Sequence, residues 1–152
     1  MRINIIAIGK IKEKYFADAV EEFSRRISRF VDFSVVEVME APPTKSVAEK
    51  QDIEGKALLQ KAKGYVVVMD GRGKTMSSEE LSELISSKCA AGQSEFSLLI
   101  GGSHGHSEFV LKSADVILSF GRNTFPHQLF RVMLTEQIYR AISIINGLPY
   151  HK

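Results

Sequence analysis

Hydrophobic residues in this chain follow two patterns that alternate from one end to the other. Apolar runs of strand length occupy residues 3–8, 33–39, 65–69, 96–100 and 116–120. Such runs are typical of strands that are covered on both faces. The pattern therefore predicts a layered α/β sheet of about five mostly parallel strands.

The stretches between these runs have the spacing of helices. Residues 14–30 carry one hydrophobic stripe, made by Phe16, Val20, Phe23, Ile27 and Phe30. Further helices are predicted over residues 46–63, 77–92, 107–113 and 126–146, the first two beginning with Ser-x-x-Glu capping boxes. Strand and helix alternate without a linker or repeat. Residues 1–152 are therefore expected to form one domain with helices on both faces of the sheet.

Composition places few further limits on function. A net charge of +2 is too small to indicate nucleic-acid binding by itself. The lysines of residues 45–63 alternate with acidic residues, which favours a solvated helix face over an RNA-binding stripe. The single cysteine, Cys89, excludes an intramolecular disulfide. With no signal peptide and no apolar run near ~20 residues, a cytoplasmic protein without membrane contact is expected.

Candidate chemistry concentrates at the ends of strands. The runs 96–100 and 116–120 end in the small-residue turns Gly101–Gly105 and Gly121–Thr124. Backbone at such turns can approach a ligand closely, so the last third of the chain is expected to hold a ligand site. Asp70–Lys74, expected as a tight turn, lacks P-loop spacing but would lie at the same edge of the sheet.

The turn Gly101–Gly105 also fits the G-x-S-x-G pattern of a serine hydrolase. Asp115 and then His127 or His151 follow Ser103 in the order that this class of enzyme uses. Three short polar residues in that order are easily found in any chain, and no separate oxyanion loop of HGGG type precedes them. A small serine hydrolase using Ser103 therefore stays a less favoured alternative.

The long C-terminal helix carries several polar candidates. His127 follows Pro126 in the first turn, where a histidine usually hydrogen-bonds nearby loop backbone. Glu136 and Arg140 are spaced to pair on the surface, while Arg131 and Arg140 could instead hold a phosphate or carboxylate. The helix is apolar over more than one face, so a second subunit is an economical cover. The four histidines show no metal-ligand spacing, and no metal is expected.

Several of these segments are recognisable together. Leu98–Gly105, Thr124–Leu129, Glu136–Ala141 and the closing Pro149–Lys152 resemble the ribosomal RNA large-subunit methyltransferase H family. Met69–Lys74 and the opening Ile-Ala-Ile-Gly-Lys10 resemble the same family, so that the resemblance covers the whole chain. Where relatives carry proline or asparagine in the glycine loop, this chain has Ser103-His104, which argues against Ser103 as a nucleophile.

The resemblance implies a SPOUT-class methyltransferase with a C-terminal trefoil knot, working as a homodimer. It implies S-adenosyl-L-methionine as the methyl donor and N3 of a pseudouridine in a large-subunit rRNA stem-loop as the acceptor. The partner would be large-subunit rRNA or the assembled ribosome. A non-catalytic ribosome- or RNA-binding protein of the same fold is the alternative.

The resemblance also assigns residues. Met69, Gly101, Leu118, Ser119, Phe120, Gly121, Arg122 and Asn123 match the donor-binding loops of the family. For catalysis, the hypothesis is that Arg140, Tyr150 and His151 bind or polarise the target nucleotide, while His127 shapes the loop. A dimer would order the terminal tail by packing it against the donor site of the partner.

Overall fold

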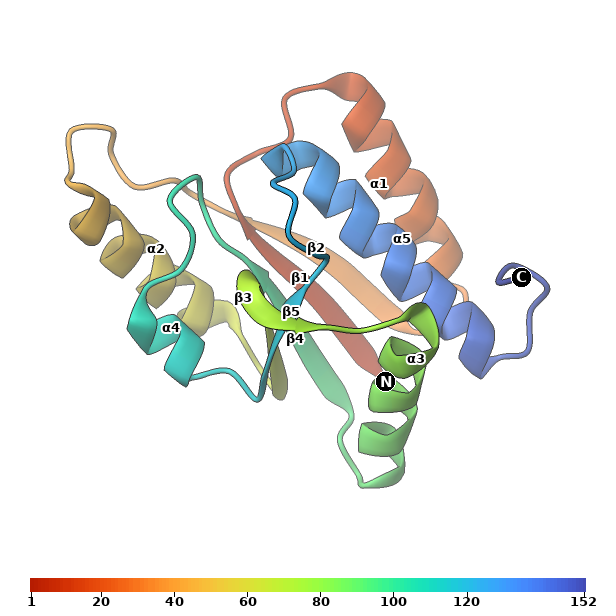
Figure 1. Cartoon of the computed structure of the whole chain (residues 1–152). Helices are drawn as coiled ribbons and strands as arrows, with labels where there is room; N and C mark the ends of the chain where they lie inside the picture. Colours follow the sequence, from red (N-terminus) through yellow and green to blue (C-terminus); the bar gives the residue numbers. More distant parts are fainter.

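The computed structural model, which describes residues 1–152, has five strands and five helices that alternate along the chain (Figure 1). They are β1 (Arg2–Ile8), α1 (Lys14–Ile27), β2 (Asp32–Val38), α2 (Val47–Lys61), β3 (Tyr65–Thr75), α3 (Ser78–Ala90), β4 (Glu95–Ile100), α4 (Glu108–Lys112), β5 (Val116–Ser119) and α5 (His127–Ile145). The strands form one sheet in the order β2-β1-β4-β3-β5, and every neighbouring pair is parallel. The predicted α/β sheet is confirmed.

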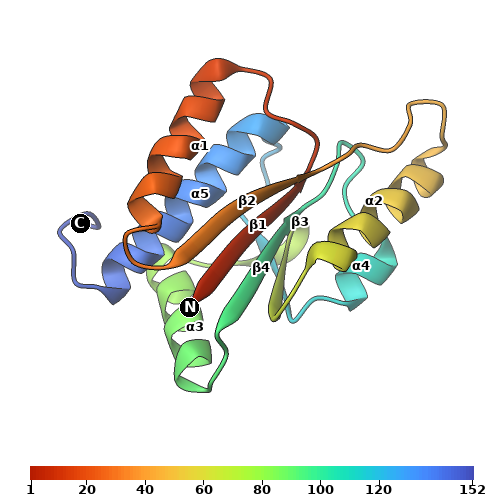
Figure 2. The same cartoon turned by 180° about the vertical axis from the view of Figure 1, so that it is seen from behind.

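Helices cover both faces of this sheet (Figure 2). On one face, α1, α3 and α5 enclose the larger hydrophobic core, to which Ile27, Leu81 and Ile138 contribute. On the other face, α2 and α4 enclose a smaller core that contains Leu58 and Val110. The continuous apolar strands β1 and β4 supply side chains to both cores, as expected for strands buried on two sides.

Local signals fix the starts of α2 and α3. Ser46 and Ser77 form complete capping boxes with Glu49 and Glu80, so both predicted boxes are confirmed. α1 has no side-chain cap of its own. The side chain of Gln128 instead accepts hydrogen bonds from the backbone N–H groups of Lys12 and Glu13, at 2.8 and 3.0 Å. α1 ends at Ile27, earlier than the hydrophobic stripe predicted, and Phe30 is exposed.

The predicted tight turn over Asp70–Lys74 is wrong. β3 continues through this segment to Thr75, and both Met69 and Lys74 lie opposite Leu118. A Cβ on Gly73 would fall 2.6 Å from the backbone carbonyl carbon of Ile117. The register with β5 therefore shifts between Met69 and Lys74, and Gly73 permits the close approach at which pairing resumes.

The charged face of α2 is mostly solvated, as expected, with Lys56 and Asp52 paired 2.8 Å apart. Glu54 departs from that expectation because it is buried, and its carboxylate accepts a hydrogen bond from the backbone N–H of Ala41 at 3.0 Å. α5, the longest helix, is flanked by α1 and α3, which cover part of its apolar surface (Figure 1). None of the helices combines the length and hydrophobicity that crossing a membrane requires.

Candidate functional site

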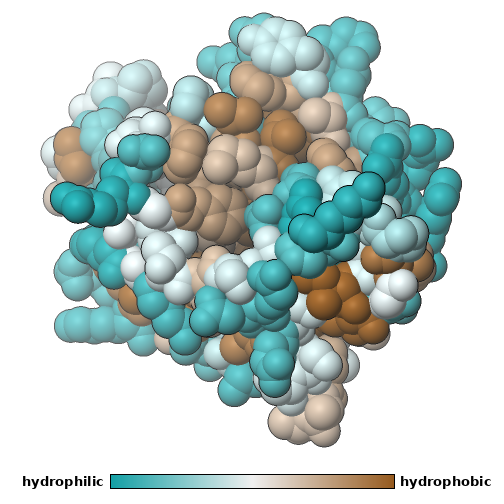
Figure 3. All heavy atoms as spheres, turned by 45° about the vertical axis from the view of Figure 1, so that its right-hand side comes forward, coloured by the Kyte–Doolittle hydropathy of each residue, from teal (hydrophilic) through white to brown (hydrophobic).

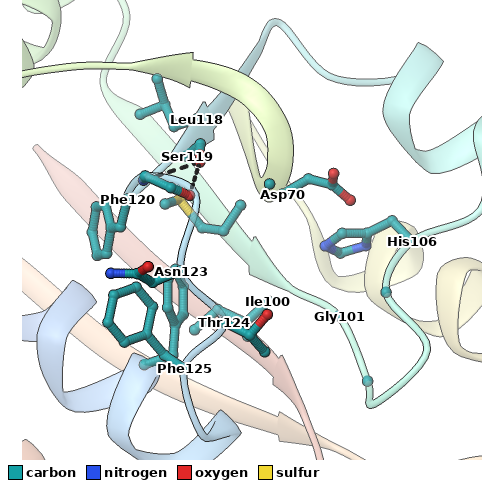
Figure 4. Close-up of a pocket in the computed structure, with 16 residues that line it drawn as sticks. Asp70, Ile100, Gly101, His106, Leu118, Ser119, Phe120, Asn123, Thr124 and Phe125 are labelled. Atoms are coloured by element: carbon teal, nitrogen blue, oxygen red, sulfur yellow. Dashed lines mark hydrogen bonds between the residues drawn. The ribbon is translucent and has the colours of Figure 1, made fainter.

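A cavity of about 240 Å³ lies at the carboxyl ends of β3, β4 and β5 (Figure 4). Three segments that are distant in sequence surround it: Met69–Gly71, the glycine loop after β4, and the segment that follows β5. Of the predicted donor-binding residues, the cavity is lined by Met69, Gly101, Leu118, Ser119, Phe120, Gly121 and Asn123. Arg122 does not line the cavity, and its side chain is exposed. A cavity of this size suits a small molecule rather than a nucleic-acid segment.

The turn after β5 is held by its own backbone and one hydroxyl. Ser119 Oγ accepts a hydrogen bond from the N–H of Gly121 at 3.1 Å and donates to its carbonyl oxygen at 3.0 Å. Gly121 has a φ of +106°, a conformation that side chains with a Cβ rarely adopt. The turn thereby keeps the backbone of residues 119–121 at the wall of the cavity.

The glycine loop after β4 is fixed from two sides. A Cβ on Gly102 would fall 2.4 Å from the carboxylate of Glu54, so any larger residue would have to displace that buried side chain. On the other side, His127 Nε2 donates a hydrogen bond to the carbonyl oxygen of Gly101. The expectation that His127 binds nearby loop backbone is confirmed.

Asp70 provides a negative charge at the rim of the cavity. The backbone N–H and Nε of Arg72 both donate to Asp70 Oδ1, at 2.9 and 2.8 Å, and Nη2 donates to Oδ2 at 3.0 Å. These bonds, above all those of the Arg72 side chain, lower the pKa of Asp70. The carboxylate is therefore ionised and already saturated by an arginine, and this favours the pocket-rim interpretation of residues 70–74 over a freely solvated turn.

A second cluster forms around Glu136, on α5. Tyr150 donates its hydroxyl to Glu136 Oε1 at 2.9 Å, and Arg140 Nε donates to the same oxygen at 3.0 Å. The Arg140 guanidinium lies 4.7 Å from the centre of the Tyr150 ring. His151 Nε2 donates to Glu79 Oε1 at 2.8 Å. The C-terminal tail is thus folded onto α5 and α3 rather than frayed.

The predicted functional residues therefore fall into two groups. Arg140, Tyr150 and His151 are brought together with one another, but none of them lines the cavity. The hydrogen bonds from His151 and from the backbone N–H of Glu79 itself lower the pKa of Glu79 to about 2, the backbone bond contributing most.

The serine-hydrolase alternative is contradicted by the geometry. Ser103 Oγ contacts only the neighbouring His104, with 3.2 Å between Oγ and Nδ1. Asp115 accepts a hydrogen bond from the N–H of Val66 at the amino ends of β3 and β5, the opposite edge of the sheet. His127 is engaged with Gly101. A serine hydrolase requires a nucleophile, a base and an orienting carboxylate that lie within hydrogen-bonding distance of one another, and these residues do not meet that requirement.

Arg131 is likewise not a ligand-binding residue. Its side chain is fully buried and donates to Glu37 at 2.8 Å and to the carbonyl oxygens of Ile8 and Gly9 at 3.3 and 3.1 Å. It joins α5 to the β1 and β2 strands instead of facing the cleft. The sequence could not exclude it, because a helical arginine usually lies at the surface.

Sequence reasoning missed His106, which lines the cavity and is buried. The only available signal was its position directly after the glycine turn, since a lone histidine before a short helix has no distinctive spacing.

A parallel sheet with a glycine-lined cavity at its carboxyl edge defines an α/β protein that binds a small ligand between its loops. Comparison with known proteins narrows this class. Residues 1–151 match the model of a family described as "Predicted SPOUT methyltransferase". The chain therefore belongs to the SPOUT methyltransferase family.

Individual relatives agree with this assignment. The chain is 46% identical to a protein from Clostridium botulinum (strain Alaska E43 / Type E3) and 48% identical to one from Limosilactobacillus reuteri (strain DSM 20016). Both are named "Ribosomal RNA large subunit methyltransferase H", and both matches cover all of each chain. Among solved structures, a probable methylase family protein from Haemophilus influenzae Rd KW20 has a similar fold. It matches with a TM-score of 0.56 and 11% identity, over 99% of this chain and 70% of that one.

Proposed function

We propose that this protein transfers the methyl group of S-adenosyl-L-methionine to N3 of a pseudouridine in a large-subunit rRNA stem-loop. The observation that carries the proposal is the cavity lined by Met69, Gly101 and the segment 118–123 except Arg122. These residues match the donor-binding loops of the family that the chain resembles. Full-length relatives with the corresponding name support the choice of substrate.

The residues present fit such a donor. Gly101 leaves the cavity open where a side chain would meet the His106 ring 3.1 Å away. Backbone groups of the glycine turns can hold the adenine and ribose without long side chains. The donor would supply an electrophilic methyl group, so the main work of the protein is to position it for attack. Arg122, exposed beside the cavity, would contact the donor or the RNA from outside.

The side chains clustered around Glu136 are suited to binding the pseudouridine that accepts the methyl group. N3 must lose its proton before or during attack, and a nearby cation stabilises the resulting anionic base. Arg140 supplies a guanidinium whose pKa is raised, chiefly by its hydrogen bonds to Glu136. Burial raises the pKa of Tyr150, so its hydroxyl stays a hydrogen-bond donor. We assign Arg140, Tyr150 and His151 to binding and polarising the target nucleotide.

A homodimer would bring the cavity of one chain together with the Arg140, Tyr150 and His151 side chains of the other. Because the tail of one chain does not line its own cavity, we propose that it completes the cavity of a second copy. The side of the molecule brought forward in Figure 3 carries hydrophobic side chains around a hollow, among hydrophilic ones. A groove on α5, lined by Phe23, Met76, Phe120, Val132 and Met133, is the surface we assign to this contact.

The proposed fold includes a trefoil knot. The extended end of β3 lies across β5, with Thr75 opposite Ser119, and the chain continues from β5 to α5 beyond it (Figure 1). Threading of the C-terminal segment through the loop of residues 70–77 would make such a knot. The proposed location remains the cytoplasm, where ribosomal RNA is available.

The experiment measures methyl transfer from labelled donor to ribosomal subunits and to whole ribosomes, both from a strain that lacks the enzyme. The modified base is then located by mass spectrometry. Removing Tyr150–Lys152 is expected to reduce turnover at least about 100-fold, because the polarising groups are lost. Removing Lys152 alone, which is exposed, is the matched control and should leave turnover unchanged.

Two results would contradict the proposal. Unchanged turnover after removal of Tyr150–Lys152 would exclude the tail from the mechanism. Failure of the full chain to bind the donor in calorimetry would favour the non-catalytic RNA-binding alternative.

A further inference from the structure

His106 is a buried histidine to which the chemistry above gives no role. It lies between the glycine loop and α4, and its relative exposure is 5%. Its Nε2 has no hydrogen-bond partner. Since the large majority of buried side-chain nitrogens in folded proteins are paired, an unpaired one requires an explanation.

The ring lies at the cavity wall. A Cβ built on Gly101 would fall 3.1 Å from both Cε1 and Nε2 of His106, so the ring edge that carries the unpaired nitrogen packs against this glycine of the cavity wall. Figure 4 shows the imidazole at the side of the cavity between Asp70 and Gly101, with Phe120 and Phe125 on the far side. His106 thus belongs to the lining of the cavity, and Nε2 is the atom of its ring that lacks a partner.

The surroundings keep this imidazole neutral. Burial lowers the pKa of His106, and this outweighs the opposing effect of the Asp70 carboxylate. Asp70 is held by Arg72, whose Nη2 also donates to the His106 carbonyl oxygen at 3.3 Å. A neutral imidazole carries one N–H donor and one acceptor nitrogen, and no net charge.

We propose that Nε2 of His106 hydrogen-bonds to the adenosine portion of the methyl donor and contributes to donor specificity. This rests on the proposed function. A neutral ring nitrogen complements the uncharged nitrogens and hydroxyls of a nucleoside, whereas the amino, carboxylate and sulfonium groups of the donor are charged. The missing partner of His106 is thus supplied when the donor binds.

The test compares the binding of S-adenosylhomocysteine and of adenosine to the full-length wild type and its variants by calorimetry. In His106→Leu the polar atoms are removed while the side chain stays bulky. Loss of one neutral hydrogen bond should weaken both ligands about tenfold. His106→Gln keeps an amide N–H near the position of Nε2, so both affinities should stay within about threefold of wild type.

His104→Leu is the matched control, because His104 is exposed on the same loop and its ring contacts only Ser103. It should bind both ligands like the wild type. Thermal unfolding verifies that each variant is folded. If the leucine variant is not, His106→Asn, whose amide ends near the position of Nδ1, should give the same weakening.

The proposal is overturned if folded His106→Leu binds both ligands with wild-type affinity. It is also overturned if the affinity for S-adenosylhomocysteine falls but that for adenosine does not, since the contact would then lie outside the nucleoside. Failure of the wild type to bind either ligand would overturn the proposed function itself, and this inference with it.

Discussion

His127 Nε2 donates a hydrogen bond to the backbone carbonyl oxygen of Gly101, which joins the first turn of α5 to the glycine loop after β4. The bond requires the tautomer with the proton on Nε2. It links the two ends of the candidate donor site, because the segment that follows β5 leads directly into α5. The position of the glycine loop therefore depends on a residue that need not touch the ligand.

Replacing His127 by alanine should loosen the glycine loop. We expect donor affinity to fall about five- to tenfold and the free energy of unfolding to fall by about 1 kcal/mol, since one hydrogen bond is lost. Calorimetry and urea unfolding measure the two quantities. His127→Gln, which retains an N–H donor, should recover part of the affinity. Equal affinities for wild type and alanine variant would show that the bond does not position the loop.

The assignment of the tail to the partner's cavity can be tested by mixing two inactive chains. Gly101→Val, which fills the cavity beside His106, is combined with a chain that lacks Tyr150–Lys152. In a mixed dimer, the truncated chain has an intact cavity and its partner has an intact tail. Random mixing should restore about a quarter of wild-type turnover if the tail acts across a two-fold interface.

A site completed within one chain predicts a different result, because neither chain then has both parts. In that case the mixture stays as inactive as each component, and the dimeric arrangement is wrong. Analytical ultracentrifugation of the mixture verifies that the chains have exchanged.

The buried Arg131 should be important for stability rather than binding. Arg131→Met removes the partner of Glu37 and the donors to two backbone carbonyls. Because Glu37 remains partly solvated, we expect the free energy of unfolding to fall by about 2–4 kcal/mol, measured in urea. Lys56→Met, which breaks an exposed pair with Asp52, should cost less than about 0.5 kcal/mol. Comparable losses in the two variants would contradict this account of Arg131.

The free energy of unfolding should decrease as the pH falls, partly because of His106. Its pKa in the folded chain is lowered from the ordinary 6.5, chiefly by burial. Below pH 6.5 the unfolded chain therefore binds a proton that the folded chain does not, and stability is lost as the pH falls further. Asp70 and Arg72 are the charged groups that act on the ring, and their effects on its pKa oppose each other.

Urea unfolding at pH 7.5, 6.0 and 5.0 measures this loss. His106→Leu should remove up to about 1.4 kcal/mol per pH unit of the slope, the limit for one proton. A slope for His106→Leu identical to that of the wild type would show that His106 protonates equally in the folded and unfolded chains.

Several features of the fold could be predicted because they depend on residues close in sequence. The α1 stripe and the capping boxes at Ser46 and Ser77 each act within a few residues, and the structure contains both boxes and the stripe as far as Ile27. The glycine turn after β5 likewise depends on residues close in sequence and was predicted. The extension of β3 was not predictable, because Gly73 permits it only through a close approach to β5, more than forty residues later.

The sequence by itself determined the order of strands and helices, the glycine turns at strand ends and, through its motifs, the family. Only the tertiary structure decided which polar residues face the cavity. Arg131 was a candidate for holding an anion and Glu54 appeared solvated, yet both are buried, while His106 had no distinctive signal yet lines the site. The physical reason is that burial and hydrogen-bond partners depend on contacts between segments far apart in the chain, which no local pattern records.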